Sequence, residues 1–410
     1  MSKELKKISF LFLFFHIVVQ THGQFIGYRI DDDKNKVCFK FEHINNLIII
    51  PVTLNDSIPL HFILDTGVRT TLLTDDNNSE LDVAYNRPVT ISGLGAVRDI
   101  NAYIASNVSL KLPGITGRGQ TLIVLGEDYL NLQSHIGKNV HGILGYDFFN
   151  HFIVKIEYDK KLITVYNKDS FTPGRKFTPH PITIESGRPY ITAAFVQQND
   201  TPISGQFLLD SGASHGLLLE TIENPDIRIP EKNLQTVIGW GLGGEVAGKL
   251  GRLKTFSIGT FTLKRVLASF TTEAQSTTIS NQIVRIGSIG GEILSRFTTI
   301  YDYSSQLIYL RKNYQFKRSF EYNLSGMDIV ASGLEFKTFT VVFVVDNSPA
   351  KKAGVKVGDV IVAINTKGAG ELSLEEINGL FRSDTGQMMQ IIVMRDNTFH
   401  SIKFRLKRII

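Results

Sequence analysis

The sequence predicts a mainly β protein with two tandem lobes that repeat each other, followed by a small α+β domain. An apolar run ending in Asp-Thr-Gly at residues 62–67 recurs as an apolar run ending in Asp-Ser-Gly at residues 207–212. The offset between the two aspartates, 210 − 65, is 145 residues, and Gly145 and Gly290 keep it downstream. Long helical patterns are scarce in both copies, where turn residues separate short apolar runs. We therefore expect two similar β lobes, each presenting one aspartate.

At 410 residues, the chain has room for two or three domains that each bury a core. Its 42% apolar and 20% charged residues are typical of an ordinary globular protein. The 44 Lys and Arg residues against 39 Asp and Glu residues give a net charge of +5, spread along the chain without a basic stripe. Nucleic acid is therefore not an expected partner.

Residues 1–23 are typical of a secretory signal peptide. Lysines precede an apolar stretch over residues 8–19, and Gly23 then offers a cleavage site before Gln24. The stretch is short for a bilayer span, although an uncleaved anchor is the alternative. We expect an exported protein, periplasmic or secreted, with no membrane span after signal removal. The only cysteine, Cys38, cannot form an intrachain disulfide, and we expect it to be buried in the first strand.

The first lobe is expected over residues 24–177 and the second over residues 178–318. A connector punctuated by prolines at residues 172–181 joins them. Residues 301–310 close the second copy, and the basic and aromatic residues 311–318 are a plausible linker to the last domain.

Asp65 and Asp210 are the candidate catalytic residues. Two carboxylates that share one proton can activate a water molecule against a peptide bond. The hydroxyl group after each aspartate can hydrogen-bond to the partner loop, and the glycine after it allows a sharp turn. The residues expected to support the dyad are Thr66, Gly67, Ser211 and Gly212. Two duplicated turns without chemistry are the alternative. A third Asp-Thr-Gly, at residues 384–386, follows Arg and Ser and is interpreted as a surface turn.

These motifs resemble those of the retropepsin- and pepsin-type aspartic proteases over about residues 37–312. In that family each lobe supplies Asp-Thr/Ser-Gly and a later apolar-apolar-Gly, matched here at residues 143–145 and, with a serine first, at residues 288–290. The resemblance implies that Asp65 and Asp210 hold the attacking water and that a flap hairpin closes over an extended peptide. Candidates for the flap are the glycines of two Gly-rich segments, Gly93, Gly95, Gly241 and Gly243.

Three positions depart from the family pattern. Val68 and Arg69 follow the first motif, where Ala or Ser is usual, and Ser288 replaces an aliphatic residue. An Arg69 guanidinium paired with the dyad would keep both carboxylates ionised and silence the shared-proton mechanism. Because Val68 and Ala213 offer no hydroxyl group to the aspartates, we also expect raised dyad pKa values and a pH optimum above the strongly acidic range.

Residues 319–410 resemble a PDZ domain of the kind associated with bacterial proteases. Residues 347–361, beginning Asn-Ser-Pro-Ala, carry the resemblance, and the spacing predicts a helix over residues 374–381 with Ser373 as its N-cap. The family implies capture of a peptide C-terminus by strand addition, or a groove filled by the protein's own chain. The residues that resemble its carboxylate-binding loop are Gly333, Leu334, Glu335 and Phe336.

Other motifs are weaker. Residues 212–216 fit the Gly-x-Ser-x-Gly of serine hydrolases, but the alternating strand–helix pattern of that fold is missing. Residues 239–244 fit a dinucleotide-binding glycine pattern without a clean helix after it. The histidines lack metal-ligand spacing, so we expect neither a metal nor a cofactor.

The leading hypothesis is an exported aspartic endopeptidase that hydrolyses polypeptides, with a PDZ domain that captures substrate or regulates cleavage. The combination is similar to predicted secreted bacterial aspartyl proteases. A catalytically silent, peptide-binding clamp with a PDZ groove is the alternative, and Arg69 is the residue that favours it.

Overall fold

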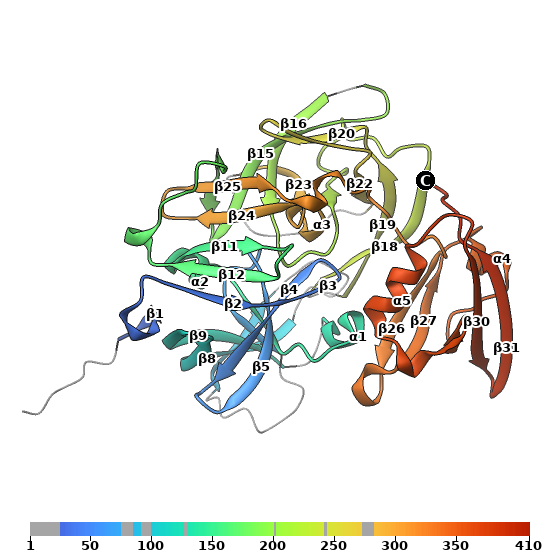
Figure 1. The fold of residues 1–410 in the computed structure, drawn as a ribbon, viewed down its shortest axis with the longest axis horizontal. Coiled ribbons are helices and arrows are strands. Elements are labelled where there is room, and N and C mark those ends of the chain that lie inside the picture. The colour runs from blue at the N-terminus through green and yellow to red at the C-terminus, as the bar shows by residue number, and fades with distance from the viewer. Residues whose placement is uncertain are drawn as a thin grey trace, which may run out of the picture.

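The computed structural model describes residues 25–74, 85–91, 100–126, 130–200, 202–241, 244–272 and 283–410. Figure 1 shows two β lobes one above the other, strands of both lobes between them, and a C-terminal domain to the side. The predicted mainly β class, with two repeated lobes and a small last domain, is confirmed.

The first lobe is a nine-stranded sheet with strand order β1-β9-β6-β10-β5-β4-β8-β7, in which β3 also pairs with β4. Its strands are β1 (Gly27–Ile30), β3 (Glu42–Ile44), β4 (Leu47–Leu54), β5 (Ile58–Leu64), β6 (Leu72–Thr74), β7 (Tyr85–Ile91), β8 (Ile100–Leu112), β9 (Ile115–Leu125) and β10 (Gly142–Leu144). Two short helices follow β9 and β10, namely α1 (Leu132–Ile136) and α2 (Tyr146–His151).

The second lobe repeats this design in a ten-stranded sheet with order β18-β19-β22-β17-β23-β16-β15-β20-β21, in which β14 also pairs with β15. Its elements are β14 (Thr183–Glu185), β15 (Arg188–Val196), β16 (Pro202–Leu209), β17 (Leu217–Leu219), β18 (Asn233–Gly241), β19 (Gly244–Arg252), β20 (Thr255–Ile258), β21 (Phe261–Lys264), β22 (Leu267–Thr271), β23 (Arg285–Ile289) and α3 (Gly291–Leu294).

The 145-residue repeat is visible in the strand register. In the first lobe β10 runs parallel to β5, with Leu144 opposite Leu64, and in the second β23 runs parallel to β16, with Ile289 opposite Leu209. In each lobe this central strand also pairs antiparallel with the strand that follows the aspartate loop. Each aspartate thus follows a strand held between two neighbours deep in its lobe.

A six-stranded sheet joins the lobes in the order β13-β25-β24-β11-β12-β2. Its strands are β2 (Lys36–Lys40), β11 (Ile153–Glu157), β12 (Leu162–Tyr166), β13 (Thr178–Pro181), β24 (Phe297–Asp302) and β25 (Leu307–Lys312). The expectation for Cys38 was wrong: it lies in β2, but its side chain is exposed because β2 is an edge strand and the neighbouring Phe39 points inward instead.

The C-terminal domain is a six-stranded sheet in the order β26-β27-β28-β30-β31, in which β29 pairs with β28. Its elements are β26 (Met327–Ser332), β27 (Thr338–Val344), α4 (Pro349–Lys352), β28 (Val360–Ile364), β29 (Lys367–Gly368), α5 (Leu374–Phe381), β30 (Met388–Arg395) and β31 (Thr398–Arg405). Helix α5 has the predicted bounds, and the Ser373 side chain caps it by accepting a hydrogen bond from Glu376 N.

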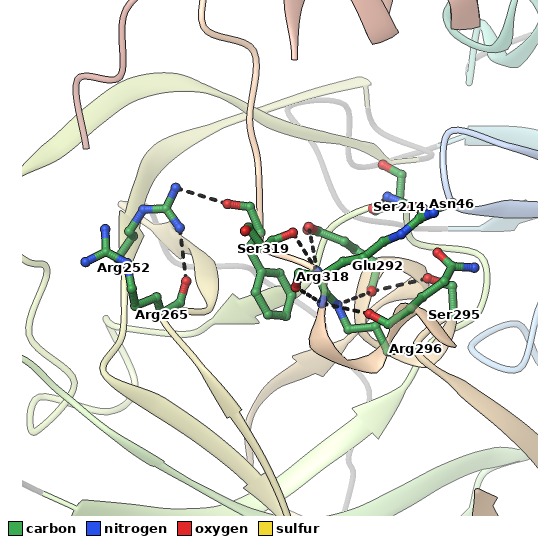
Figure 2. A network of polar contacts seen from close by, with 11 residues as sticks. Asn46, Ser214, Arg252, Arg265, Glu292, Ser295, Arg296, Arg318 and Ser319 are labelled. Atoms are coloured by element: carbon green, nitrogen blue, oxygen red, sulfur yellow. Dashed lines mark hydrogen bonds and ion pairs between the residues drawn. The ribbon is translucent and has the colours of Figure 1, made fainter. Parts of the chain in front are cut away.

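Two buried arginines of the second lobe hold the linker to this domain (Figure 2). Arg296 donates to the carbonyl oxygens of Arg318 and Ser319 and lies 3.5 Å from the centre of the Phe320 ring. Arg252 donates to the carbonyl oxygen of Phe320 at 3.1 Å. Because each guanidinium has several carbonyl partners, the C-terminal domain is fixed against the second lobe. In the part of the chain that the structure describes, no helix is long and apolar enough to cross a bilayer.

Candidate active site

The two aspartates begin equivalent loops at the ends of β5 and β16. Asp65 N donates to the carbonyl oxygen of Leu144 at 2.9 Å, and Asp210 N donates to that of Ile289 at the same distance. The central strand of each lobe therefore fixes where each aspartate loop starts.

Four hydrogen bonds lock the loops together in a symmetric arrangement. Thr66 Oγ1 donates to the carbonyl oxygen of Leu209 at 2.7 Å, and Ser211 Oγ donates to that of Leu64 at 2.8 Å. Each hydroxyl oxygen also accepts from the other loop: Thr66 N donates to Ser211 Oγ, and Ser211 N to Thr66 Oγ1, both at 3.0 Å. Both side chains are buried, so the predicted supporting role of the two hydroxyl groups matches the observed contacts.

The glycines of the two motifs let the carboxylates approach each other. A Cβ atom on Gly67 would lie 3.0 Å from Asp210 Oδ1 and 3.2 Å from Asp65 Oδ1, so both carboxylates face this glycine. A Cβ atom on Gly212 would overlap the carboxylate of Asp65. The structure thus brings Asp65 and Asp210 together, as the repeat predicted.

The pKa values of both carboxyl groups lie above the ordinary value for an aspartate. Burial, followed by the charge of Asp210, raises the pKa of Asp65 well above its ordinary value, although the N–H groups of Gly67 and Gly212 donate to its Oδ1 at 2.6 and 3.2 Å. Burial also raises the pKa of Asp210, but the Arg285 charge and a hydrogen bond from Asp65 oppose this rise. The pair therefore keeps a proton to higher pH than an isolated aspartate would, and the two adjacent carboxyl groups can share it.

Two arginines next to the dyad were missed by the sequence analysis. Arg285 forms an ion pair with Glu220 at 2.7 Å, and Arg188 Nε donates to the carbonyl oxygen of Gly67 at 2.9 Å; both arginines line the same cleft as Asp210. Both are isolated basic residues at the starts of strands, so no local motif marks them.

Arg69, in contrast, does not line the cleft. Its side chain is exposed, its stem lies against the turn at Gly187, and its charge acts on Asp147 of α2. Pairing of Arg69 with the dyad, the reason for expecting a silent clamp, is therefore not observed.

Ser288, the other departure from the family pattern, has a polar partner. Its Oγ lies 3.0 Å from His215 Nε2, and both residues line the cleft. Burial lowers the pKa of His215 to about 4, so this histidine is neutral at physiological pH. A hydrogen bond thus takes the place of an aliphatic contact in the wall.

The dyad lies in a cleft of about 660 Å³ between the lobes. Apolar side chains from both lobes line it, and they are Leu47, Ile63, Val68, Leu72, Leu130, Leu132, Ile136, Ile143, Leu208, Leu218, Val237, Ile238 and Val246. Charged and polar side chains, among them Arg188, Glu245 and Arg285, line the cleft as well, so it offers an extended peptide both apolar and polar contacts.

Of the flap candidates, Gly241 ends β18 in the hairpin with β19, and it lines the cleft. Gly93, Gly95 and Gly243 lie outside the described residues. The ring of the neighbouring Trp240 packs against His135 of α1, with ring centroids 4.1 Å apart and the planes tilted by 31°, so the hairpin of the second lobe reaches the first lobe across the cleft.

The predicted peptide-binding residues Gly333, Leu334, Glu335 and Phe336 form the turn between β26 and β27. Leu334 is 90% exposed, and none of the four lines the cleft. The last domain instead contributes Asp328 of β26 and Arg382, which follows α5. The described residues contain no cluster of three or more metal-ligating side chains.

Two protein families match segments of the chain. The aspartyl protease family matches residues 50–148 and 194–291, each segment containing one aspartate loop, and the PDZ domain family matches residues 340–395. Among solved structures, the aspartic proteinase from Irpex lacteus is similar at 13% identity with a TM-score of 0.44, over 69% of this chain and 99% of that chain. No curated protein matches the chain.

Proposed function

Because the chain is a two-lobed, aspartyl-protease-like protein with a C-terminal PDZ domain, we propose that it is an aspartic endopeptidase acting on extended polypeptides. The observation that carries the proposal is the pair of adjacent carboxyl groups with raised pKa values, on loops held together by the Thr66 and Ser211 hydroxyl bonds.

In the proposed reaction, ionised Asp210 takes a proton from water while Asp65 gives its proton to the carbonyl oxygen of the scissile bond. The water oxygen bonds to the carbonyl carbon and forms a neutral tetrahedral diol. The proton on Asp210 then passes to the leaving nitrogen, the C–N bond breaks, and a diol proton returns to Asp65. The dyad thus ends in its starting state. The N-terminal segment, basic and then apolar, is typical of an export signal, and we propose on this basis that the enzyme acts outside the cytoplasm.

The test uses Asp65→Asn and Asp210→Asn beside the wild type, assayed on a mixed peptide library from pH 3 to pH 8 with and without a statine-type inhibitor. We expect each substitution to reduce cleavage by at least ~10³-fold, since each removes one of the two proton-transfer groups. Cleavage by the wild type alone, blocked by the inhibitor, supports the proposal. No cleavage by the wild type at any pH, or cleavage by either variant at the wild-type rate, rejects it.

Thermal unfolding provides the folding control. The raised pKa of Asp65 means that its carboxyl group costs stability as pH rises above the ordinary value of about 4, because the unfolded chain then ionises more easily than the folded one. Asn cannot ionise, so Asp65→Asn is expected to unfold at a higher temperature than the wild type near pH 7.

A further inference from the structure

Two arginines of the second lobe line the cleft beside the dyad. Arg188, the first residue of β15, donates from Nε to the carbonyl oxygen of Gly67 at 2.9 Å. A Cβ atom on Gly67 would lie 3.0 Å from Asp210 Oδ1, so Arg188 is anchored to the dyad loop itself. Burial raises the pKa of Asp210, and the charge of Arg285 opposes this rise. A polypeptide whose scissile bond lies at the dyad therefore passes close to both arginines.

The two arginines come from the strands on either side of β16, the strand that leads to Asp210. Arg188 begins β15 and Arg285 begins β23, and these strands flank β16 in the sheet. Burial raises the pKa of Tyr190 of β15, and the charges of Arg285 and Arg188 both oppose this rise. Since both charges act on Tyr190 and on Asp210, they belong to one basic cluster.

Each arginine is anchored through Nε and keeps its two terminal nitrogens for a ligand. The Nε of Arg188 donates to Gly67, and the Nε of Arg285 forms an ion pair with Glu220 at 2.7 Å. Within the described residues, neither Nη1 nor Nη2 of either arginine donates a hydrogen bond to the protein. The remaining N–H groups of a guanidinium fit the two oxygens of a carboxylate.

The glutamates near these arginines do not line the cleft. Glu220 is 8% exposed and pairs with Arg285. Glu185 accepts a hydrogen bond from Ile283 N at 3.0 Å. Neither glutamate is among the residues that line the cavity, whereas both arginines are. The cleft surface beside the dyad is therefore basic, and the acids that balance its charge lie outside the cleft.

The first lobe does not repeat this basic cluster. The positions 145 residues earlier, 188 − 145 and 285 − 145, are His43 and Val140. Burial lowers the pKa of His43 to about 4, so it is neutral at physiological pH, and Val140 is fully buried. Neither residue lines the cleft. Because the repeat places equivalent positions on opposite sides of the dyad, the basic cluster acts on one side of the scissile bond only.

We propose that Arg188 and Arg285 form a subsite that selects an acidic side chain, Asp or Glu, on one side of the scissile bond. Their terminal N–H groups donate to the carboxylate oxygens, and their charge offsets the repulsion between that carboxylate and the dyad. This inference rests on the proposed endopeptidase function for the identity of the ligand. The subsite directs the enzyme to acidic polypeptide segments, which apolar walls alone would disfavour.

The test compares peptides that differ only by Glu or Gln at one position, scanned along a parent peptide that the wild type cleaves. Glu and Gln have similar shapes, so the ratio of their kcat/KM values reports the effect of the charge. The peptides are acetylated and amidated to remove terminal charges. We expect Glu to be preferred ~10-fold at a position on one side of the scissile bond, and the preference to shrink as salt is added.

Removal of either arginine is expected to remove the preference. Arg188→Gln and Arg285→Gln should each reduce the Glu-over-Gln ratio to less than about 2-fold, because each removes a charged donor. Effects of these variants on the dyad lower cleavage of both peptides alike and cancel in the ratio. The double variant Arg285→Gln/Glu220→Gln removes the ion pair without leaving a buried charge, and it is expected to lose the preference as well.

Arg382→Gln is the matched control. Arg382 lines the same cleft from the PDZ domain, and its charge acts on Asp328 of β26. This variant is expected to keep the Glu-over-Gln ratio of the wild type. Equal kcat/KM for Glu and Gln at every position, or a preference that neither arginine variant reduces, would overturn the inference. A preference found only in peptides with a free C-terminus would also overturn it, because the terminus is then recognised instead of a side chain.

Binding measurements separate this inference from the proposed function. By fluorescence anisotropy, full-length Asp65→Asn is expected to bind the Glu peptide ~10-fold more tightly than the Gln peptide, and Asp65→Asn/Arg285→Gln to bind both equally. If the wild type cleaves no peptide, the parent peptide is chosen by its binding to Asp65→Asn. An arginine-dependent difference in Kd without cleavage means that the endopeptidase proposal fails while the subsite stands. Cleavage without a preference for Glu means the reverse.

Discussion

The two aspartate loops have the same geometry but different electrostatic surroundings. Their cross-loop hydrogen bonds agree within 0.1 Å. The arginines next to the dyad, however, come only from the second lobe, and 145 residues before Arg188 and Arg285 the first lobe has His43 and Val140. The comparison teaches that the repeat positions the two carboxyl groups, whereas residues that break the repeat place positive charge near Asp210 and oppose the rise of its pKa.

The largest loss of activity is expected from substitution of the motif glycines, because the two lobes leave unequal space for an added Cβ atom. Gly212→Ala would push its Cβ into the Asp65 carboxylate, so we expect at least ~10²-fold loss of kcat/KM from misplacement of the dyad. Gly67→Ala requires Asp210 to yield only slightly, and a smaller loss is expected. Gly370→Ala, with no atom within 4 Å of the new Cβ, is the control. A larger loss for Gly67→Ala than for Gly212→Ala would contradict this ranking.

Removal of the Thr66 or Ser211 hydroxyl group tests whether the two loops contribute equally to the locking. Thr66→Val and Ser211→Ala each leave a buried N–H group and a buried carbonyl oxygen without a partner, which costs ~1–3 kcal/mol per unsatisfied group. We expect similar losses of unfolding free energy for the two variants in urea denaturation. Thr66→Ser keeps the hydroxyl group and is expected to retain most of the stability. A clear inequality between the two lobes would show that the locking is one-sided.

Substitutions of Arg285 and Glu220 test whether charges present only in the second lobe set the pKa of Asp210. The Arg285 charge lowers the pKa of Asp210, so Arg285→Gln is expected to raise that pKa and move the acid limb of the pH dependence of kcat/KM to higher pH. Glu220→Gln removes the anion that compensates Arg285 and is expected to move the same limb to lower pH. Shifts in one direction for both variants would argue against this assignment. The wild type is expected to peak above pH 3, because burial raises the pKa of both aspartates.

The smallest effect is expected at Arg69. Its charge acts on Asp147, away from the dyad, so Arg69→Gln is expected to change kcat/KM by less than about 2-fold, as is usual for exposed charges. The pH profile of this variant is expected to match that of the wild type. A large gain in activity would mean that Arg69 inhibits the dyad after all.

The sequence predicted the features that repeat or that follow local rules. The two Asp-x-Gly loops, the cross-loop hydroxyl bonds and the Ser373 cap depend on neighbouring residues or on one fixed offset, so they are readable along the chain. Arg285 and Arg188 could not be found this way, because their positions next to the dyad arise from contacts between distant strands. The exposed Cys38 was missed because an edge position depends on the sheet order.

The pairing in the sheet between the lobes allows the chain to be cut into two matching fragments between β12 and β13. Strands β11 and β24 pair from Val154 opposite Tyr301 to Glu157 opposite Thr298, whereas β13 pairs within its own half. Severing the main chain between β12 and β13 would therefore leave two fragments, each with half of the dyad and one open edge that fits the other. Coexpressed fragments are expected to reassemble into an active enzyme, and either fragment alone is expected to self-associate through that edge.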